Sequence, residues 1–208
     1  GVDAYRFSVA WPRVIPEGRG AVNAAGLDYY DRLVDALCEK GIKPCPTLFH
    51  WDLPSVLEAE GGWLQRSTAE AFGEYAAVVA ARLADRAAMW FPVNEPNVVT
   101  FLGYAFGNHA PGRQLGVAAL PVAHHLLLGH GLAVAALRAA GATSVGCANN
   151  HSPIWPASDS PEDTLAASMF DAIYNRLYAE PIVLGSYPAE LAAFLPPAAA
   201  DDLPTISA

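Results

Sequence analysis

The sequence predicts an α/β fold built around a parallel sheet, and two features of the chain lead to that prediction. Short β-prone segments alternate with helical segments along the 208 residues, as expected when parallel strands are joined by helical crossovers. The loops that follow the strands are long and carry Trp, His, Asn and Glu, whereas those returning from helix to strand are short. This asymmetry favours a barrel over an open sheet, because barrel enzymes gather functional residues at the carboxyl ends of their strands.

The first half of the chain contains two strand signals, each followed by a helix signal. We expect strands at residues 5–10 and 42–49, a helix at 24–40 that stops at Gly41, and a Pro- and Gly-rich loop at 12–23. A second helix is expected from Ser67, because Ser67 and Glu70 have capping-box spacing and an apolar face follows them.

The second half repeats the same order of elements. We expect strands at residues 89–93 and 144–149, a loop up to Gly112, a helix up to about Ala140 that stops at Gly141, and a helix opening at Ser160. The tail from Pro196 to Ala208 shows no clear element.

The composition limits the classes of partner. The formal net charge of −9 gives a surface that repels phosphate backbones and anionic membranes, so nucleic acid and membrane are not expected partners. There is no run of 18 apolar residues, and the first residues lack the order of a signal peptide. These features predict a cytoplasmic protein.

Metal and cofactor sites have little support in the sequence. The three cysteines, Cys38, Cys45 and Cys147, lack the paired spacing of zinc or redox motifs. The histidines of the 120–130 segment, His124, His125 and His130, are not spaced to share one face of a helix. No Gly-x-Gly-x-x-Gly or Gly-x-Ser-x-Gly motif occurs. We therefore expect no metal and no cofactor.

Polar and aromatic residues at three strand ends form the candidate site. Glu95 and Asn94 come directly after the third predicted strand, while Arg6, His50 and Trp51 lie at or just beyond the ends of the first two. A carboxyl, an amide, a cation, an imidazole and an indole together suit a neutral ligand rich in hydroxyl groups. Spacing alone leaves open that Glu95 is a solvated loop carboxylate.

Four segments resemble successive signatures of family 1 glycoside hydrolases: Tyr5–Arg13, Thr47–Pro54, Asn94–Asn97 and Pro156–Asp163. The resemblance implies a (β/α)8 TIM barrel that hydrolyses terminal β-linked glucosides or galactosides with retention. The 208 residues would correspond approximately to strands two to five of eight, as part of a single barrel domain truncated at both ends. The expected ligand is a small β-glucoside or oligosaccharide, and the oligomeric state stays open.

The resemblance also implies a role for each candidate residue. Glu95 would be the general acid/base, and Asn94 would hold the sugar 2-hydroxyl. His50 and Trp51 would bind hydroxyls further round the ring, and Arg6 would support the nucleophile. Because residue 95 is still a Glu, the resemblance implies that the substrates are O-glycosides and not thioglycosides.

Departures from the family pattern bear on activity. Retention needs a second carboxylate about 5 Å from the first, in the family the Glu of a Glu-Asn-Gly motif, and no Glu in this sequence is followed by Asn-Gly. We therefore expect this chain alone to be inactive and poorly soluble. Asn97 stands where many relatives have Trp, and Pro92 stands inside a strand, where it removes a ladder donor.

Two other readings remain. The chain could be a non-catalytic carbohydrate-binding or decayed barrel remnant, for which the absent nucleophile is the distinguishing feature. An aldolase-like barrel would need a lysine at a strand end, but Lys40 and Lys43 flank a helix-to-strand turn on the wrong face.

Overall fold

A computed structural model describes all residues from 1 to 208, and they form two compact units. The first unit comprises Gly1–Asn94 and Gly129–Ala148, and the second comprises Glu95–Leu128 and Asn149–Ala208.

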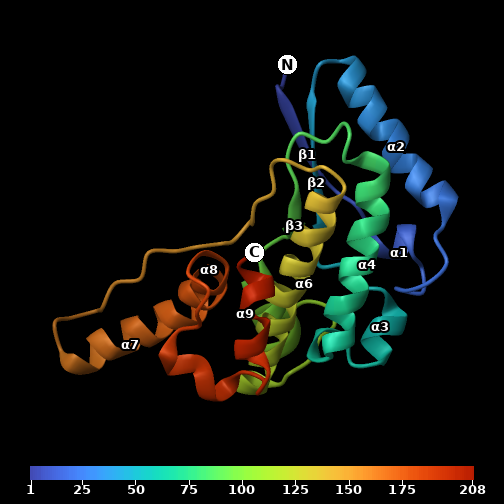
Figure 1. The fold of residues 1–208 in the computed structure, drawn as a ribbon. Helices are drawn as coiled ribbons and strands as arrows, with labels where there is room; N and C mark the ends of the chain where they lie inside the picture. The colour runs from blue at the N-terminus through green and yellow to red at the C-terminus, as the bar shows by residue number, and fades with distance from the viewer. The chain divides into compact units, whose positions relative to one another are not determined.

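The first unit contains a three-stranded parallel sheet in the order β1-β2-β3. Figure 1 shows the strands side by side, with α2 and α4 packed along them. The elements are β1 Ala4–Ser8, α1 Trp11–Val14, α2 Ala24–Glu39, β2 Lys43–Phe49, α3 Ser55–Ala59, the 3-10 turn η1 Gly62–Leu64, α4 Arg66–Leu83 and β3 Phe91–Val93. The predicted alternation is confirmed here, and α2 ends beside Gly41, whose φ of 68° suits the left-handed turn expected there.

The capping-box prediction at Ser67 is wrong. Helix α4 begins at Arg66 with Gln65 as its N-cap, and no side chain caps it. Instead, Arg66 forms an ion pair with Glu70 at 3.1 Å, so the glutamate is engaged by a cation one turn away. The apolar face predicted for this helix is buried, as expected from its periodicity; it comprises Phe72, Tyr75, Ala76, Val79 and Leu83.

Aromatic side chains dominate the core between the sheet and α4. Trp11 stacks on Tyr75 with ring centroids 5.2 Å apart, and Phe49 meets Phe72 edge-on at 6.1 Å. The hydroxyl of Tyr75 lies 2.8 Å from the carbonyl oxygen of Val9 and 3.1 Å from that of Leu48. One buried phenol therefore ties together the carboxyl ends of β1 and β2, just before the candidate site residues.

Tyr75→Phe should lower the free energy of unfolding by about 1 to 3 kcal/mol, since two buried carbonyl groups lose their shared donor. Burial already raises the pKa of Tyr75 well above its usual value, so the hydroxyl stays a donor across the working pH range. Urea unfolding of the chain measures the change, with Tyr5→Phe at a ring that is 47% exposed as the matched control. Equal stabilities for the two variants would contradict this role.

The fourth predicted strand, 144–149, forms only two isolated bridges, Trp90 to Val145 and Asn94 to Ala148. The backbone N–H of Trp90 donates to the carbonyl oxygen of Ser144. In a regular parallel ladder, the residue two positions later would also donate its N–H to the 144–149 segment. That residue is Pro92, which has no N–H. Three residues (91–93) then lie between the two bridges on one segment and only two (146–147) on the other, as at a bulge. The lost ladder donor that Pro92 predicts thus coincides with irregular pairing just before residue 95.

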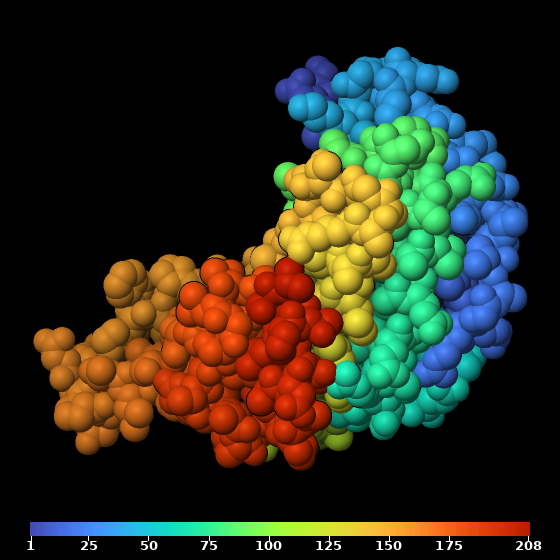
Figure 2. All heavy atoms as spheres, viewed as in Figure 1, coloured from blue at the N-terminus to red at the C-terminus, as the bar shows by residue number.

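The second unit is helical. Its elements are α5 Pro96–Val98, the π-helix η2 Val99–Ala105, the 3-10 turn η3 Gly116–Ala119, the start of α6 Leu120–Ala139, α7 Pro161–Asp171, the π-helix η4 Ala172–Arg176, α8 Leu177–Val183, the 3-10 turn η5 Ala189–Phe194 and α9 Ala199–Ile206. Helix α6 continues into the first unit and ends just before Gly141, as predicted. Helix α7 has the predicted N-cap, because Ser160 Oγ accepts a 3.1 Å hydrogen bond from the N–H of Asp163. No residue of α7 is buried, and Figure 2 shows this segment (orange) on the surface.

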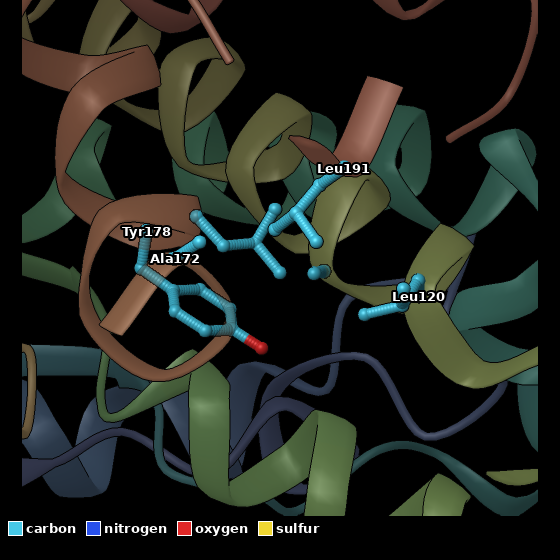
Figure 3. Close-up of a cluster of buried hydrophobic side chains, with 6 residues drawn as sticks. Leu120, Ala172, Tyr178 and Leu191 are labelled. Atoms are coloured by element: carbon cyan, nitrogen blue, oxygen red, sulfur yellow. The ribbon is translucent and has the colours of Figure 1, made fainter. Parts of the chain in front are cut away.

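The core of the second unit lies where α6 meets the segments that follow α7 (Figure 3). Its buried side chains are Leu120, Ala123, Ala172, Leu177, Tyr178 and Leu191. The 116–139 stretch is long and apolar enough to span a membrane by length and composition, but 78% of its most apolar window is buried. The buried core helices of soluble proteins have the same length and composition, so this stretch is weak evidence for a membrane span.

The expectation that residues 196–208 form no helix or strand is wrong, since α9 covers Ala199–Ile206. Buried polar contacts join α9 and the segment before it to α6. His124 Nε2 lies 3.0 Å from Asp202 Oδ2, and His124 Nδ1 lies 2.8 Å from the hydroxyl of Tyr187. His124 is only 1% exposed, so both ring nitrogens are used inside the protein.

Candidate active site

The candidate site in the first unit is organised around the side chain of Asn94, which is 4% exposed. Parallel pairing in register places Arg6 of β1 opposite Cys45 of β2 and Ser8 opposite Thr47. The residue after β3 is Asn94, whose N–H donates to the carbonyl of Phe49 at 2.9 Å. The sheet therefore brings residues from all three strand ends together, as the sequence predicted for a parallel sheet.

Arg6 fixes the orientation of the Asn94 amide. Its Nη2 donates to Asn94 Oδ1 at 2.6 Å, and its Nε donates to Thr47 Oγ1 at 2.8 Å. The guanidinium also lies 4.6 Å from the centroid of the Phe91 ring, a cation–π contact. Arginine suits this position because its planar fork of donors reaches two acceptors at once.

The same orientation sets the partner of His50. Because Asn94 Oδ1 accepts from Arg6, the amide nitrogen Nδ2 faces His50 Nε2, at 3.3 Å. Nε2 accepts this hydrogen bond when the ring proton is on Nδ1. Trp51 follows His50 in the chain, and its Nε1 donates to the carbonyl oxygen of Asn94 at 3.0 Å. Four of the five predicted residues thus meet within one network.

The fifth residue, Glu95, directly follows Asn94 and begins the second unit. Its backbone is left-handed, with φ 45° and ψ 64°, and its carbonyl accepts the N–H of Val98 at 2.9 Å. Trp51 also has a positive φ, of 80°. Non-glycine residues adopt this conformation rarely and at a cost, and such residues concentrate at functional sites.

Asp52 is a neighbour of this network that sequence reasoning did not single out as a site residue. Burial raises the pKa of its carboxyl, and hydrogen bonds from the backbone N–H groups of Asp52 and His50 partly oppose that rise. Its Oδ1 is covered and has no hydrogen-bond partner. The only sequence signal was its place directly after Trp51, which does not reveal that the carboxyl turns inward.

Arg6→Leu should lower the free energy of unfolding by about 1 to 3 kcal/mol, because the buried Oδ1 of Asn94 loses its donor. Urea unfolding measures the change, and Arg32→Leu, at an exposed position on α2, is the matched control. An Arg6→Leu variant as stable as the control would show that the Asn94 amide does not depend on this arginine.

Comparison with known proteins places this arrangement in a family. The sequence model of glycosyl hydrolase family 1 matches residues 1–205. The chain is 47% identical to a β-glucosidase of Agrobacterium sp., covering 100% of this chain and 46% of the relative. It is 49% identical to thermostable β-glucosidase B of Thermobispora bispora, covering 92% and 39%. The chain thus spans about half the length of the curated relatives it matches.

Solved structures give the same result. Virulence factor SghA from Agrobacterium tumefaciens matches with a TM-score of 0.95 and 46% identity, covering 100% of this chain and 47% of that one. The family 1 β-glucosidase from Thermotoga maritima matches with a TM-score of 0.94 and 40% identity, covering 100% and 48%. These matches confirm the predicted fold class, a partial (β/α)8 barrel. The chain belongs to glycosyl hydrolase family 1.

Proposed function

We propose that this chain is part of a single (β/α)8 barrel domain of a retaining β-glycosidase of the β-glucosidase type, with Glu95 as the general acid/base. The observation that carries the proposal is the network of Arg6, His50, Trp51 and Asn94 at the strand ends, with Glu95 next in the chain. The named β-glucosidase relatives support the same activity. A structure of SghA with its substrate analogue salicin supports a small glucoside as the substrate.

Each residue has a role that its contacts suit. Asn94, held by Arg6 and facing His50, would bond the 2-hydroxyl of the sugar. His50 and Trp51 would bind hydroxyls further round the ring, where an imidazole and an indole offer both polar and apolar contact. Arg6 would keep the nucleophilic carboxylate ionised, since a nearby guanidinium favours the charged form of a carboxyl.

The mechanism would be a double displacement. Glu95 protonates the leaving oxygen while a second carboxylate attacks the anomeric carbon, and Glu95 then activates the water that releases the sugar. No Glu in these residues is followed by Asn-Gly, so the 208-residue chain by itself should not hydrolyse glycosides. This is also the observation that favours the alternative, a non-catalytic carbohydrate-binding or decayed remnant.

A composite enzyme distinguishes these proposals. The 46% of the Agrobacterium β-glucosidase that matches this chain is replaced by residues 1–208, and hydrolysis of 4-nitrophenyl β-glucoside is measured. We expect turnover by the composite and none by the chain alone, with the β-anomer of glucose as the first product by proton NMR. A folded composite without turnover would favour the remnant, and an α-anomer first product would contradict retention.

A further inference from the structure

His50 and Trp51 are adjacent in the chain, yet both side chains reach the same residue, Asn94. His50 Nε2 lies 3.3 Å from Asn94 Nδ2, and Trp51 Nε1 donates to the carbonyl oxygen of Asn94 at 3.0 Å. The two rings lie with their centroids 5.0 Å apart. Neighbouring side chains of an extended strand point to opposite faces of the sheet. The backbone therefore has to leave the extended conformation just after β2 if both rings are to serve one site.

Residue 51 makes this change of direction. The φ angle of Trp51 is 80°, in the left-handed region that favours glycine and that a bulky side chain adopts at a cost. Such a conformation costs about 1 to 3 kcal/mol and persists only where the surrounding structure holds it. A contact that joins the peptide groups around His50 and Trp51 would keep both rings in place.

The carboxyl group of Asp52 makes such a contact. It accepts hydrogen bonds from its own backbone N–H and from the backbone N–H of His50. The N–H of His50 belongs to the peptide bond before residue 50, and the N–H of Asp52 belongs to the peptide bond after residue 51. One carboxyl group therefore joins the two peptide bonds that enclose His50 and Trp51.

The surroundings of the Asp52 carboxyl point to the same role. Its Oδ1 is covered and has no hydrogen-bond partner. Burial, and to a smaller extent the negative charge of Asp52, raises the pKa of Tyr75, whose hydroxyl joins the carboxyl ends of β1 and β2. The carboxyl thus lies towards the core and not towards the sugar. A carboxyl in such a place costs folding free energy unless its hydrogen bonds offset the cost, and the two backbone N–H groups supply those bonds.

We propose that Asp52 is a positioning residue of the active site, whose carboxyl closes the turn around His50 and Trp51 and keeps both rings directed at the sugar. Asp52 does not touch the substrate. The proposal rests on the proposed function in one respect, because there the two rings bind sugar hydroxyls. Backbone N–H groups need an oxygen acceptor and not a charge. The amide oxygen of Asn should therefore replace the carboxylate in part, whereas the methyl group of Ala should not.

Steady-state kinetics of the composite enzyme with methyl β-glucoside test this role. Methoxide is a poor leaving group, so chemistry is slow and KM reports binding of the sugar. Asp52→Ala should raise KM about tenfold, and Asp52→Asn only about two- to threefold. Asp3→Ala, at an exposed position of the same unit, is the matched control and should leave KM within about twofold. A variant that merely lost part of its folded population would show a lower kcat and an unchanged KM.

A double-mutant cycle shows whether Asp52 acts through the indole of Trp51. Adding Asp52→Ala to the Trp51→Ala enzyme should raise KM by less than about threefold, because one of the two rings that Asp52 positions is already gone. The same tenfold rise in both backgrounds would overturn the proposal.

Far-UV circular dichroism shows whether each variant keeps its helix content. If Asp52→Ala does not fold, a comparison of Asp52→Asn with Asp52→Glu takes its place. Asn keeps an oxygen acceptor at the same distance from the backbone, whereas Glu keeps the charge on a longer side chain. A lower KM for Asp52→Asn than for Asp52→Glu is the expected result, and the reverse order would contradict a role as an acceptor.

The indole N–H signals of the composite enzyme, labelled with ¹⁵N-tryptophan, give a test that does not need turnover. The Trp51 signal is the one that disappears in Trp51→Phe. Asp52→Ala should shift this signal and leave the other indole signals in place, and Asp52→Asn should shift it less. An unshifted Trp51 signal would overturn the proposal. The same spectra of the 208-residue chain, which has five tryptophans, serve if the composite does not fold.

The two proposals fail separately. A shifted Trp51 signal in a folded composite without turnover would refute the glycosidase proposal and leave the contact between Asp52 and the turn in place. Turnover with an unshifted signal and an unchanged KM in Asp52→Ala would refute the role of Asp52 and leave the glycosidase.

Discussion

Glu95→Gln in the composite enzyme should lower kcat/KM for methyl β-glucoside by about 10² to 10⁴, the usual contribution of a general acid. The same variant should lower kcat/KM far less for 2,4-dinitrophenyl β-glucoside. Methoxide leaves only with a proton, whereas the dinitrophenolate leaves without one. Because kcat/KM reports the first bond cleavage, steady-state rates on the two substrates separate the acid role from a general loss of structure.

Glu74→Gln is the control for this experiment, because Glu74 is an exposed carboxylate on α4. It should leave kcat/KM for both substrates within about twofold. Equal losses for the good and the poor leaving group in Glu95→Gln would mean that residue 95 does not supply the proton. The catalytic assignment would then have to move to another carboxyl.

Acidification should destabilise the chain through His130. Burial, together with the smaller effect of the positive charge of Arg138, lowers the pKa of this imidazole to about 4. The unfolded chain, with an ordinary histidine pKa near 6.5, takes up the proton first as the pH falls. The stability that comes from a neutral His130 is therefore complete above about pH 6.5 and is lost between about 6.5 and 4, by about 3 kcal/mol in all.

Urea unfolding at pH 7 and at pH 4.5 measures this loss, and His130→Leu should remove that part of the pH dependence. His151→Leu, at an exposed position, is the matched control and should keep the dependence of the unmodified chain. If His130→Leu and the unmodified chain lose stability in parallel over this range, the buried imidazole is not the cause.

The sequence predicted the sheet and its site because both follow from local patterns. The predicted strand 42–49 starts directly after the helix stop at Gly41 and ends in the apolar, β-prone run Thr47–Phe49, and β2 occupies Lys43–Phe49. Parallel strands end at one edge, so polar residues after three strands had to meet, as Arg6, His50, Trp51 and Asn94 do. Glycines at 41 and 141 marked both helix ends through their left-handed backbone.

The remaining features depend on information that no local pattern carries. The segment 96–105 was predicted as loop because it contains proline and glycine and is followed by more of both, yet Pro96 opens α5 and η2 continues it. Proline is well suited to the first turn of a helix, which composition alone does not show. Helix α9 contains Pro204 and is held by Asp202, whose partner His124 lies 78 positions away in the chain.

The left-handed backbone of Trp51 and Glu95 sets the stability of this chain against the side chains that its site uses. Glycine at either position would remove about 1 to 3 kcal/mol of conformational strain. The tryptophan and the glutamate at these positions therefore cost stability that glycine would not cost. A stability screen of substitutions at these two positions, set beside an activity screen of the composite enzyme, should therefore rank them in opposite order.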